Sequence, residues 1–141
     1  MGSNVLIMVA PNDMEKMGGV LSLLFGGAMD CSNGKYDTRK ILNYIKAGNG
    51  QLWVLVTEGD DPKFLAAAAT EVQVHPDHKT ARMWMAGGDF EALMVDGQET
   101  FYEYARAQGC QDCEIEGPEW IMPFLARHSF KLSTVVMRKE L

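Results

Sequence analysis

The sequence lacks the features that would place it outside the class of ordinary globular domains. No apolar run approaches the roughly 20 residues that a membrane helix needs, so no membrane span is predicted. Its three cysteines, an odd number without disulfide-dense spacing, are typical of a reducing cytoplasm. No basic segment precedes the first apolar run, at residues 5–10, so no signal peptide is expected. We therefore expect a cytoplasmic protein with no membrane partner.

Positive charge is also scarce. Lys and Arg number 13 against 19 Asp and Glu, which gives a formal net charge of -6 at pH 7. A general nucleic-acid binder gains its affinity by neutralising phosphates, so this balance argues against a nucleic-acid partner without excluding a protein partner. What is present, 141 residues with 47% hydrophobic and 23% charged, has the size and composition of one globular domain over residues 1–141.

Apolar runs, helix caps and turn residues divide the chain into strands and helices. Pro11 stops the first apolar run, Thr38 is placed to cap a helix, and the turn at residues 59–62 separates two strands as in a hairpin. The predicted strands are residues 4–10, 51–58, 64–75, 80–88, 112–116 and 131–141, and the predicted helices are residues 12–27 (interrupted at Gly18-Gly19), 39–47, 89–109 and 117–130. The order β-α-α-β-β-β-α-β-α-β predicts the α/β class, with a mixed α+β sheet that ends in a parallel crossover.

The helix predicted over residues 89–109 has one continuous apolar face at helical spacing. Gly97 lies within this face, where glycine costs up to ~1 kcal/mol relative to alanine, so we expect either a close packing contact or a kink there. The helix predicted after Gly117 repeats the apolar spacing. The inner positions of the two helices are Phe90, Leu93, Met94, Gly97, Phe101, Tyr104 and Ala105, and then Trp120, Ile121, Phe124, Leu125 and His128.

Two short patterns accompany this order of elements. The long helix ends in Ala105-Arg106-Ala107-Gln108-Gly109-Cys110, and the next helix begins Gly117-Pro118-Glu119-Trp120. In order and pattern the chain resembles the GCN5-related N-acetyltransferases (the GNAT superfamily), and among them the short divergent GNAT-like proteins of tailed phages. The resemblance implies a GNAT-like fold. It also implies an acetyl-CoA-dependent N-acetyltransferase whose acceptor is a small amine, a protein N-terminus or a lysine.

The resemblance further implies where acetyl-CoA would bind. In the family, the strand before the long helix pairs with the pantetheine arm, and the following loop points backbone amides at the pyrophosphate, at a helix start that favours anions. Two adjacent glycines permit close backbone approach here, but the family's Gln/Arg-x-x-Gly-x-Gly/Ala pattern is incomplete, and Asp89 and Glu91 stand where the phosphates would arrive. The implied cofactor positions are Met83, Trp84, Met85, Ala86, Gly87, Gly88, Asp89 and Phe90.

The catalytic groups that the resemblance implies are less complete. Many family members carry a Tyr on the last helix, five residues before a Gly-Phe pair, which protonates the departing thiolate. Leu125 and Ser129 stand at the Tyr and Gly positions of this chain, and Phe130 matches the Phe. A leucine cannot donate a proton. As the general base that deprotonates the amine, Glu116 is the first candidate and Glu114 the second, because both lie on one face of their strand.

These departures leave two functions open. One is the N-acetyltransferase of an amine. The other is a fold retained without catalysis, acting as a phage virion or assembly component or as an inhibitor of a host protein. A phage-encoded chain of this kind would lie in the host cytoplasm or in the virion.

A separate group of residues has the composition of a zinc site. Cys110 and Cys113 form a Cys-x-x-Cys, and His75 and His78 form a His-x-x-His. Their order and spacing do not match common zinc modules. The Cys-x-x-Cys also follows a helix C-terminus, whereas redox pairs usually sit at the N-terminus that lowers a thiol pKa. We therefore expect no bound metal and no redox role.

Overall fold

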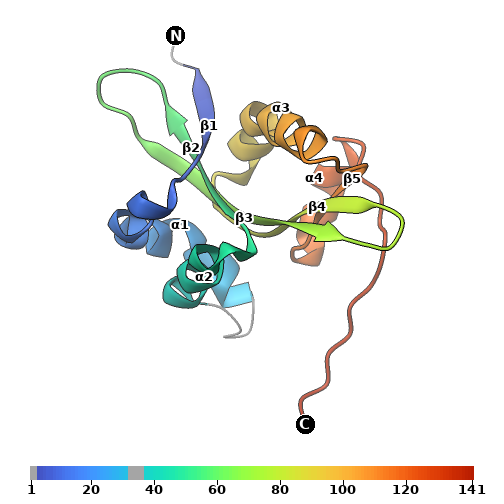
Figure 1. Cartoon of the computed structure of the whole chain (residues 1–141). Helices are drawn as coiled ribbons and strands as arrows, with labels where there is room; N and C mark the ends of the chain where they lie inside the picture. The colour runs from blue at the N-terminus through green and yellow to red at the C-terminus, as the bar shows by residue number, and fades with distance from the viewer. Residues whose placement is uncertain (1–2, 32–36) are drawn as a thin grey trace.

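The computed structural model describes residues 3–31 and 37–141, which form a five-stranded mixed sheet with helices on both faces (Figure 1). Short helical turns at Pro11–Asp13, Glu15–Met17, Ile45–Asn49 and Glu119–Ile121 join or extend the main elements. The strands are β1 (Asn4–Met8), β2 (Gln51–Thr57), β3 (Phe64–Val74), β4 (Lys79–Gly88) and β5 (Asp112–Ile115), and the helices are α1 (Gly18–Cys31), α2 (Thr38–Tyr44), α3 (Phe90–Ala107) and α4 (Met122–Ala126).

The strands lie side by side in the order β1-β2-β3-β4-β5. All neighbours are antiparallel except β4 and β5, which are parallel because α3 returns the chain to the same end of the sheet before β5 begins. The mixed sheet with a parallel crossover through the long helix is therefore confirmed.

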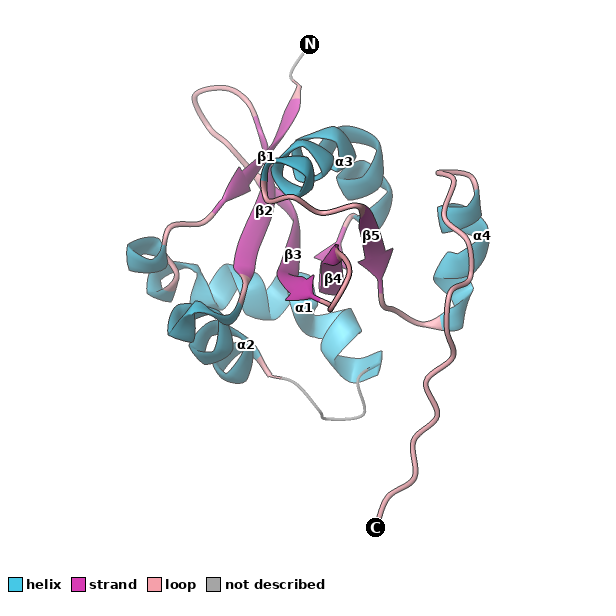
Figure 2. Ribbon diagram, turned by 45° about the vertical axis from the view of Figure 1, so that its right-hand side comes forward, coloured by secondary structure: helices cyan, strands magenta, loops and turns pink. Residues whose placement is uncertain are grey.

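The sheet separates two apolar layers, with α1 and α2 on one face and α3 on the other (Figure 2). β3 supplies alanines to both, so helices approach the centre of the sheet closely from either side. Ala67 and Ala69 face the α1 layer, Ala66 and Ala68 face the α3 layer, and all four are fully buried. Alanine has little intrinsic preference for strands; the pairing of β3 with β2 on one side and β4 on the other holds this run extended.

The inner face of α3 matches the predicted face, with Leu93, Met94, Gly97, Phe101 and Ala105 all buried. The helix runs through Gly97 without interruption, and a Cβ there would lie 3.5 Å from the side chain of Leu6 on β1. That is an ordinary van der Waals distance, so an alanine side chain would fit at Gly97, and neither the expected kink nor an unusually close contact is found there. None of the described helices is both long enough and apolar enough to cross a membrane.

The first helical region differs from the prediction. Gly18 and Gly19 begin α1 instead of interrupting a helix, because the preceding residues form separate short turns at Pro11–Asp13 and Glu15–Met17. Thr38 is the first residue of α2, and Asp37 is the N-cap, with its side chain accepting a hydrogen bond from the Lys40 amide at 2.8 Å. The polar, turn-rich sequence of residues 30–37 predicts a connector between the two helices, and residues 32–36 of it lie outside the described residues.

The prediction of a final strand over residues 131–141 is wrong. Residues 130–141 have no helical or strand structure, and the C-terminal end of the chain leads away from the body of the molecule (Figure 1 and Figure 2). A strand needs a partner for its backbone groups, and no described strand pairs with this segment. The preceding helix is also shorter than predicted: after the turn Glu119–Ile121, α4 ends at Ala126, and Ser129 follows with a φ of 69°.

Candidate functional site

The two parallel strands of the sheet diverge where the resemblance places the cofactor. The register of β4 with β5 runs from Thr80–Asp112 to Met83–Ile115, and the Glu116 amide donates one further bond to the Met83 carbonyl at 2.9 Å. β5 ends there, whereas β4 continues to Gly88. The register of β4 with β3 also shifts by one residue between Met83 and Met85, and a bulge of this kind bends a strand. The backbone of β4 beyond Met83 is thus separated from β5.

The predicted cofactor positions on β4 have mostly buried side chains. Met83 packs in the α3 layer, whereas Trp84 and Met85 pack in the α1 layer, and Ala86 is half-buried. The rings of Trp84 and Tyr44 meet edge to face at a centroid distance of 5.7 Å. These side chains belong to the two cores, so only the backbone of this stretch is suited to contact a ligand between the strands.

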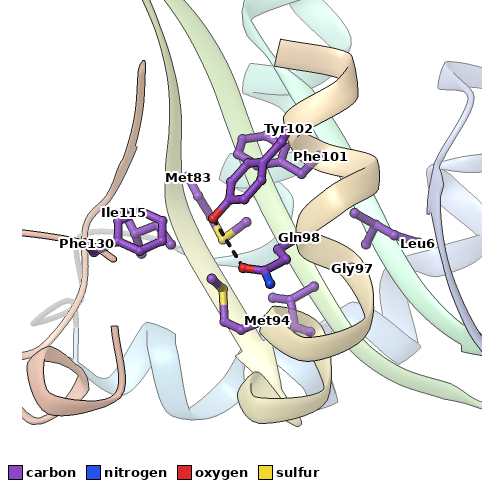
Figure 3. A pocket seen from close by; sticks show the side chains of 10 residues that line it. Leu6, Met83, Met94, Gly97, Gln98, Phe101, Tyr102, Ile115 and Phe130 are labelled. Atoms are coloured by element: carbon purple, nitrogen blue, oxygen red, sulfur yellow. Dashed lines mark hydrogen bonds between the residues drawn. The ribbon is translucent and has the colours of Figure 1, made fainter. Parts of the chain in front are cut away.

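The space between β4, β5 and α3 is filled by apolar side chains (Figure 3). They surround a cavity of about 10 Å³, which is lined by Met83 from β4, Met94 and Tyr102 from α3, Ile115 from β5, and Phe130. That is about the minimum that holds one water molecule. The Tyr102 hydroxyl donates to Gln98 Oε1 at 3.4 Å within the same helix. An extended ligand arm between the strands would have to displace these side chains.

The start of α3 is occupied by the chain's own carboxylate. A single residue, Asp89, joins β4 to α3. Its side chain accepts a hydrogen bond from the Ala92 amide at 3.0 Å, and its own amide donates to the Leu65 carbonyl at 2.9 Å. Glu91 adds a second acidic group to the first turn. The positive end of the α3 dipole is therefore already matched by negative charge.

The two glycines at the end of β4 are fitted against the protein itself. A Cβ on Gly87 would lie 1.9 Å from the carbonyl oxygen of Leu24 in α1, and one on Gly88 would lie 2.5 Å from the carbonyl oxygen of Leu65 in β3. Gly88 also has a φ of 84°, in the left-handed region that favours glycine. The close approach that these glycines permit is that of α1 and β3.

The two predicted base candidates have different surroundings. Glu114 is exposed on β5, whereas Glu116 forms an ion pair with Arg82. Arg82 also pairs with Glu71 at 3.1 Å, and the Tyr44 hydroxyl donates to Glu71 at 2.9 Å. Arg82 thus links β3, β4 and the residue that follows β5 on the α1 face of the sheet.

This network was not predicted, although the sequence holds a signal for it. The sequence His75-Pro76-Asp77-His78 is typical of a turn, which pairs Val74 with Lys79, and counting back along that antiparallel register places Glu71 opposite Arg82. Opposite charges facing one another across two strands attract.

The last helix packs its apolar residues against the N-terminal part of α3, at Phe90 and Met94. Leu125, which the resemblance aligns with the family's proton donor, is 7% exposed and packs with Met94 and Ile121. The half-buried His128 has its ring 5.0 Å from that of Phe124. Ser129 is the one non-glycine residue with positive φ among those described, a conformation that favours glycine.

The cysteine and histidine pairs do not come together as a metal site. Among residues 3–31 and 37–141, no group of three or more His, Cys, Asp or Glu side chains is placed to hold a metal ion. The rings of His75 and His78 stack at 4.5 Å, and His78 Nδ1 lies 2.7 Å from Asp77 Oδ1. Burial, followed by the neighbouring Cys110 and Asp112, raises the pKa of Cys113 to about 11.

The thiol of Cys110 also has a raised pKa, chiefly because of burial. A reactive or metal-binding cysteine needs a lowered pKa, since the thiolate is the form that attacks or ligates. These two thiols are therefore held in their neutral form at physiological pH.

Comparison with known proteins identifies the fold. No protein-family model and no curated protein matches this chain. Among solved structures, it is similar to an aminoglycoside acetyltransferase from an uncultured soil metagenomic sample in complex with sisomicin, with a TM-score of 0.70, 15% identity, and coverage of 98% of this chain and 96% of that one. A GNAT family acetyltransferase from Staphylococcus aureus matches with a TM-score of 0.65 and 12% identity over 99% of both chains. An aminoglycoside N-acetyltransferase in complex with CoA matches with a TM-score of 0.63 and 12% identity over 99% of this chain and 96% of that one. The fold of this chain is that of the GCN5-related N-acetyltransferases.

Proposed function

We propose that this chain keeps the acetyltransferase fold without acetyl transfer and acts by binding another protein, as a virion or assembly component or as an inhibitor of a host protein. The observation that supports this most directly is the cap of α3. The Asp89 side chain accepts a hydrogen bond from the Ala92 amide in the turn over which the family binds the pyrophosphate. The start of α3 is therefore already occupied by the chain's own carboxylate.

Charge and backbone length at this position both disfavour the pyrophosphate. A phosphate within about 4 Å of the Asp89 carboxylate would meet a repulsion of about 1–4 kcal/mol, or roughly 5-fold to several hundred-fold in affinity. Neither Asp89 nor the two glycines before it brings a positive charge, and Glu91 adds another negative one. A one-residue connection also offers fewer free amides than a loop. The residues at the α3 start therefore do not fit the pyrophosphate of acetyl-CoA.

The residues at the catalytic positions also disfavour acetyl transfer. Leu125 is a buried apolar residue where the family's acid would stand. Glu116, the first candidate base, is neutralised by Arg82, so its negative charge already serves an ion pair that joins strands. A base must be free to reach the amine before its pKa matters.

A second candidate function is an acyl-CoA-dependent N-acyltransferase of an amine, and the divergence of β4 from β5 favours it. A pantetheine arm would then lie along Met83, Trp84, Met85 and Ala86, and the pyrophosphate over Gly87, Gly88, Asp89 and Phe90. Glu116, or else Glu114, would accept the proton of the amine. The fold similarity to an acetyltransferase in complex with CoA and to one in complex with sisomicin supports a small-amine acceptor under this candidate.

Calorimetric titration with acetyl-CoA and with desulfo-CoA separates the two candidates. We expect no binding by the unmodified protein at millimolar cofactor. Asp89→Ser keeps a capping oxygen and removes the charge, and Glu91→Gln is the matched change of charge outside the cap. Saturable binding of both cofactors to the unmodified protein would overturn the non-catalytic proposal, and a gain of binding in Asp89→Ser alone would show that the cap is what excludes the cofactor.

A further inference from the structure

A groove lies along the outer edge of the sheet. It is bounded on one side by β5 with the turn before it, and on the other by residues 128–133, and its floor is α3 at Tyr102 and Arg106. We call it the β5 groove. It holds about 600 Å³, within the range of roughly 300–1,000 Å³ that is typical of sites for small ligands. It includes none of the cofactor positions at residues 83–90, so it is separate from the site implied for acetyl-CoA.

The wall formed by β5 is an unpaired strand edge. β5 is the last strand in the sheet order, and among the described residues only β4 pairs with it (Figure 2). Alternate N–H and C=O groups of an outer strand point away from the sheet and can pair with an extended ligand. The β5 groove therefore offers the hydrogen bonds that a peptide backbone needs.

The acidic and basic side chains of the groove are equal in number and lie on different sides of this edge. Cys113 packs on the α3 side of β5, so the alternation of side chains along a strand places Asp112 and Glu114 on the other side. Arg106 belongs to α3, and Lys131 belongs to the segment that faces β5. A ligand of one sign would be attracted by one pair of groups and repelled by the other. The groove therefore favours a ligand that carries both signs of charge.

Three of these four charges are not used to hold the fold together. Asp112 Oδ1 accepts a hydrogen bond from Thr80 Oγ1 at 2.5 Å. Glu114, Arg106 and Lys131 are exposed, and none of the three forms an ion pair with another described residue. Glu114 on one side of the edge and Arg106 on the other are thus available to a positive and a negative group of one ligand.

The floor and the length of the groove define the rest of the ligand. Tyr102, Ala105 and Phe130 bring apolar surface, which suits small apolar side chains. β5 has four residues, and at ~3.3 Å a residue it matches an extended segment of about three or four residues. We propose that the β5 groove binds a short peptide with free termini. The peptide backbone pairs with β5, its ammonium group lies at Glu114, and its carboxylate lies at Arg106.

Calorimetric titration with trialanine, a peptide of small residues that carries both terminal charges, tests the proposal. We expect saturable binding with a dissociation constant of about 1 mM or below. N-acetyltrialanine lacks the positive charge and trialanine amide lacks the negative one. Each should bind roughly 10-fold more weakly than trialanine, because each loses one hydrogen bond between charged groups. The result does not depend on whether acetyl-CoA binds, since the groove shares no residue with the cofactor positions.

Two variants identify the group that binds each terminus. Glu114→Gln should weaken the binding of trialanine roughly 10-fold and leave that of N-acetyltrialanine unchanged, whereas Arg106→Gln should weaken trialanine as much and leave trialanine amide unchanged. Glu103→Gln and Arg39→Gln are the matched controls, because they remove the same charges at exposed positions outside the groove, and they should have no effect. All four positions are exposed, so the fold, followed by circular dichroism, should not change.

Three outcomes would overturn the proposal. The first is the absence of saturable trialanine binding up to roughly 10 mM. The second is equal binding of the three peptides, because the terminal charges would then not be recognised. The third is a variant that weakens all three peptides equally, or none of them, because its charge would then not bind the terminus assigned to it.

Discussion

Replacing Gly87 with alanine measures how closely α1 is held against the end of β4. The added Cβ would lie 1.9 Å from the Leu24 carbonyl oxygen, 2.7 Å from the Leu24 carbonyl carbon and 2.9 Å from the Phe25 Cα. All three atoms belong to the backbone, so no change of side-chain rotamer relieves the overlap. To bring the shortest distance from 1.9 Å to an ordinary contact at 3.4 Å, α1 would have to move outward by about 1.5 Å.

The cost follows from what α1 buries. Leu21 and Phe25 are both fully buried, and complete burial of such a side chain contributes about 1.5–3 kcal/mol. Overpacking a core usually costs about 1–3 kcal/mol, and a shift that also loosens two buried side chains belongs at or above the upper end. We therefore expect Gly87→Ala to lower the free energy of unfolding by about 3 kcal/mol, and hydrogen exchange to become faster in α1 first.

The assay is urea unfolding followed by tryptophan fluorescence, together with hydrogen exchange by mass spectrometry. Gly97→Ala is the control, because its Cβ would meet neighbours only at 3.5 Å and alanine favours a helix by up to ~1 kcal/mol. This control should leave the protein as stable or slightly more stable. The described packing of α1 against β4 is wrong if the free energy of unfolding of Gly87→Ala is within about 0.5 kcal/mol of that of the unmodified protein and α1 is equally protected from hydrogen exchange.

Three further predictions concern charged and titratable groups. Arg82→Met should lower the free energy of unfolding in urea by about 2 kcal/mol, because Glu71 would keep a mostly buried charge without this partner. Lys40→Met, which removes an exposed ion pair, should change the free energy of unfolding by less than ~0.5 kcal/mol, and equal effects of the two changes would refute the reasoning. The hydrogen bond to Asp77 raises the pKa of His78, so this pair stabilises the fold below the ordinary His pKa of 6.5 and loses its effect as the pH rises through the pKa of the folded protein. In an NMR titration, Asp77→Asn should lower the pKa of His78, and an unchanged pKa would exclude Asp77 as the cause. With a pKa of about 11, roughly one Cys113 thiol in a thousand is ionised at pH 8. Alkylation of Cys113, measured by mass spectrometry, should therefore be slow until the protein unfolds, and rapid labelling of the folded protein would contradict the burial of this thiol.

The order of the elements was predictable because each long element has a periodic pattern or a turn that bounds it. The continuous inner face of α3 and the hairpin turn at residues 59–62 placed the helix and two strands within a few residues of their observed bounds. The strand predicted over residues 131–141 failed for a different reason. Its composition favours a strand, but strand structure depends on a neighbouring edge, and a pattern along one segment does not say whether such a neighbour is within reach.

The surroundings of the candidate site could be predicted only in part. The resemblance implied cofactor positions from Met83 onward, and the pairing of β4 with β5 ends at Met83. It could not show that Asp89 would turn back onto the Ala92 amide, because an acidic residue before a helix is equally compatible with a cap and with a solvated side chain. The ion pair of Glu116 with Arg82 depends on the path of the chain after β5. No periodic pattern in the sequence predicts that path.

The buried alanines of β3 also determine how the sequence can change over time. Ala66 to Ala69 lie between two helical layers, and each is 0% exposed. Alanine is usually among the most replaceable residues, because its side chain is small and carries no polar group. Here a larger side chain would push α1 or α3 off the sheet, and glycine would loosen the strand, so both directions of substitution are closed. Substitutions should therefore accumulate more slowly in this run of alanines than at larger apolar residues nearer the ends of the sheet, where a neighbour can adjust.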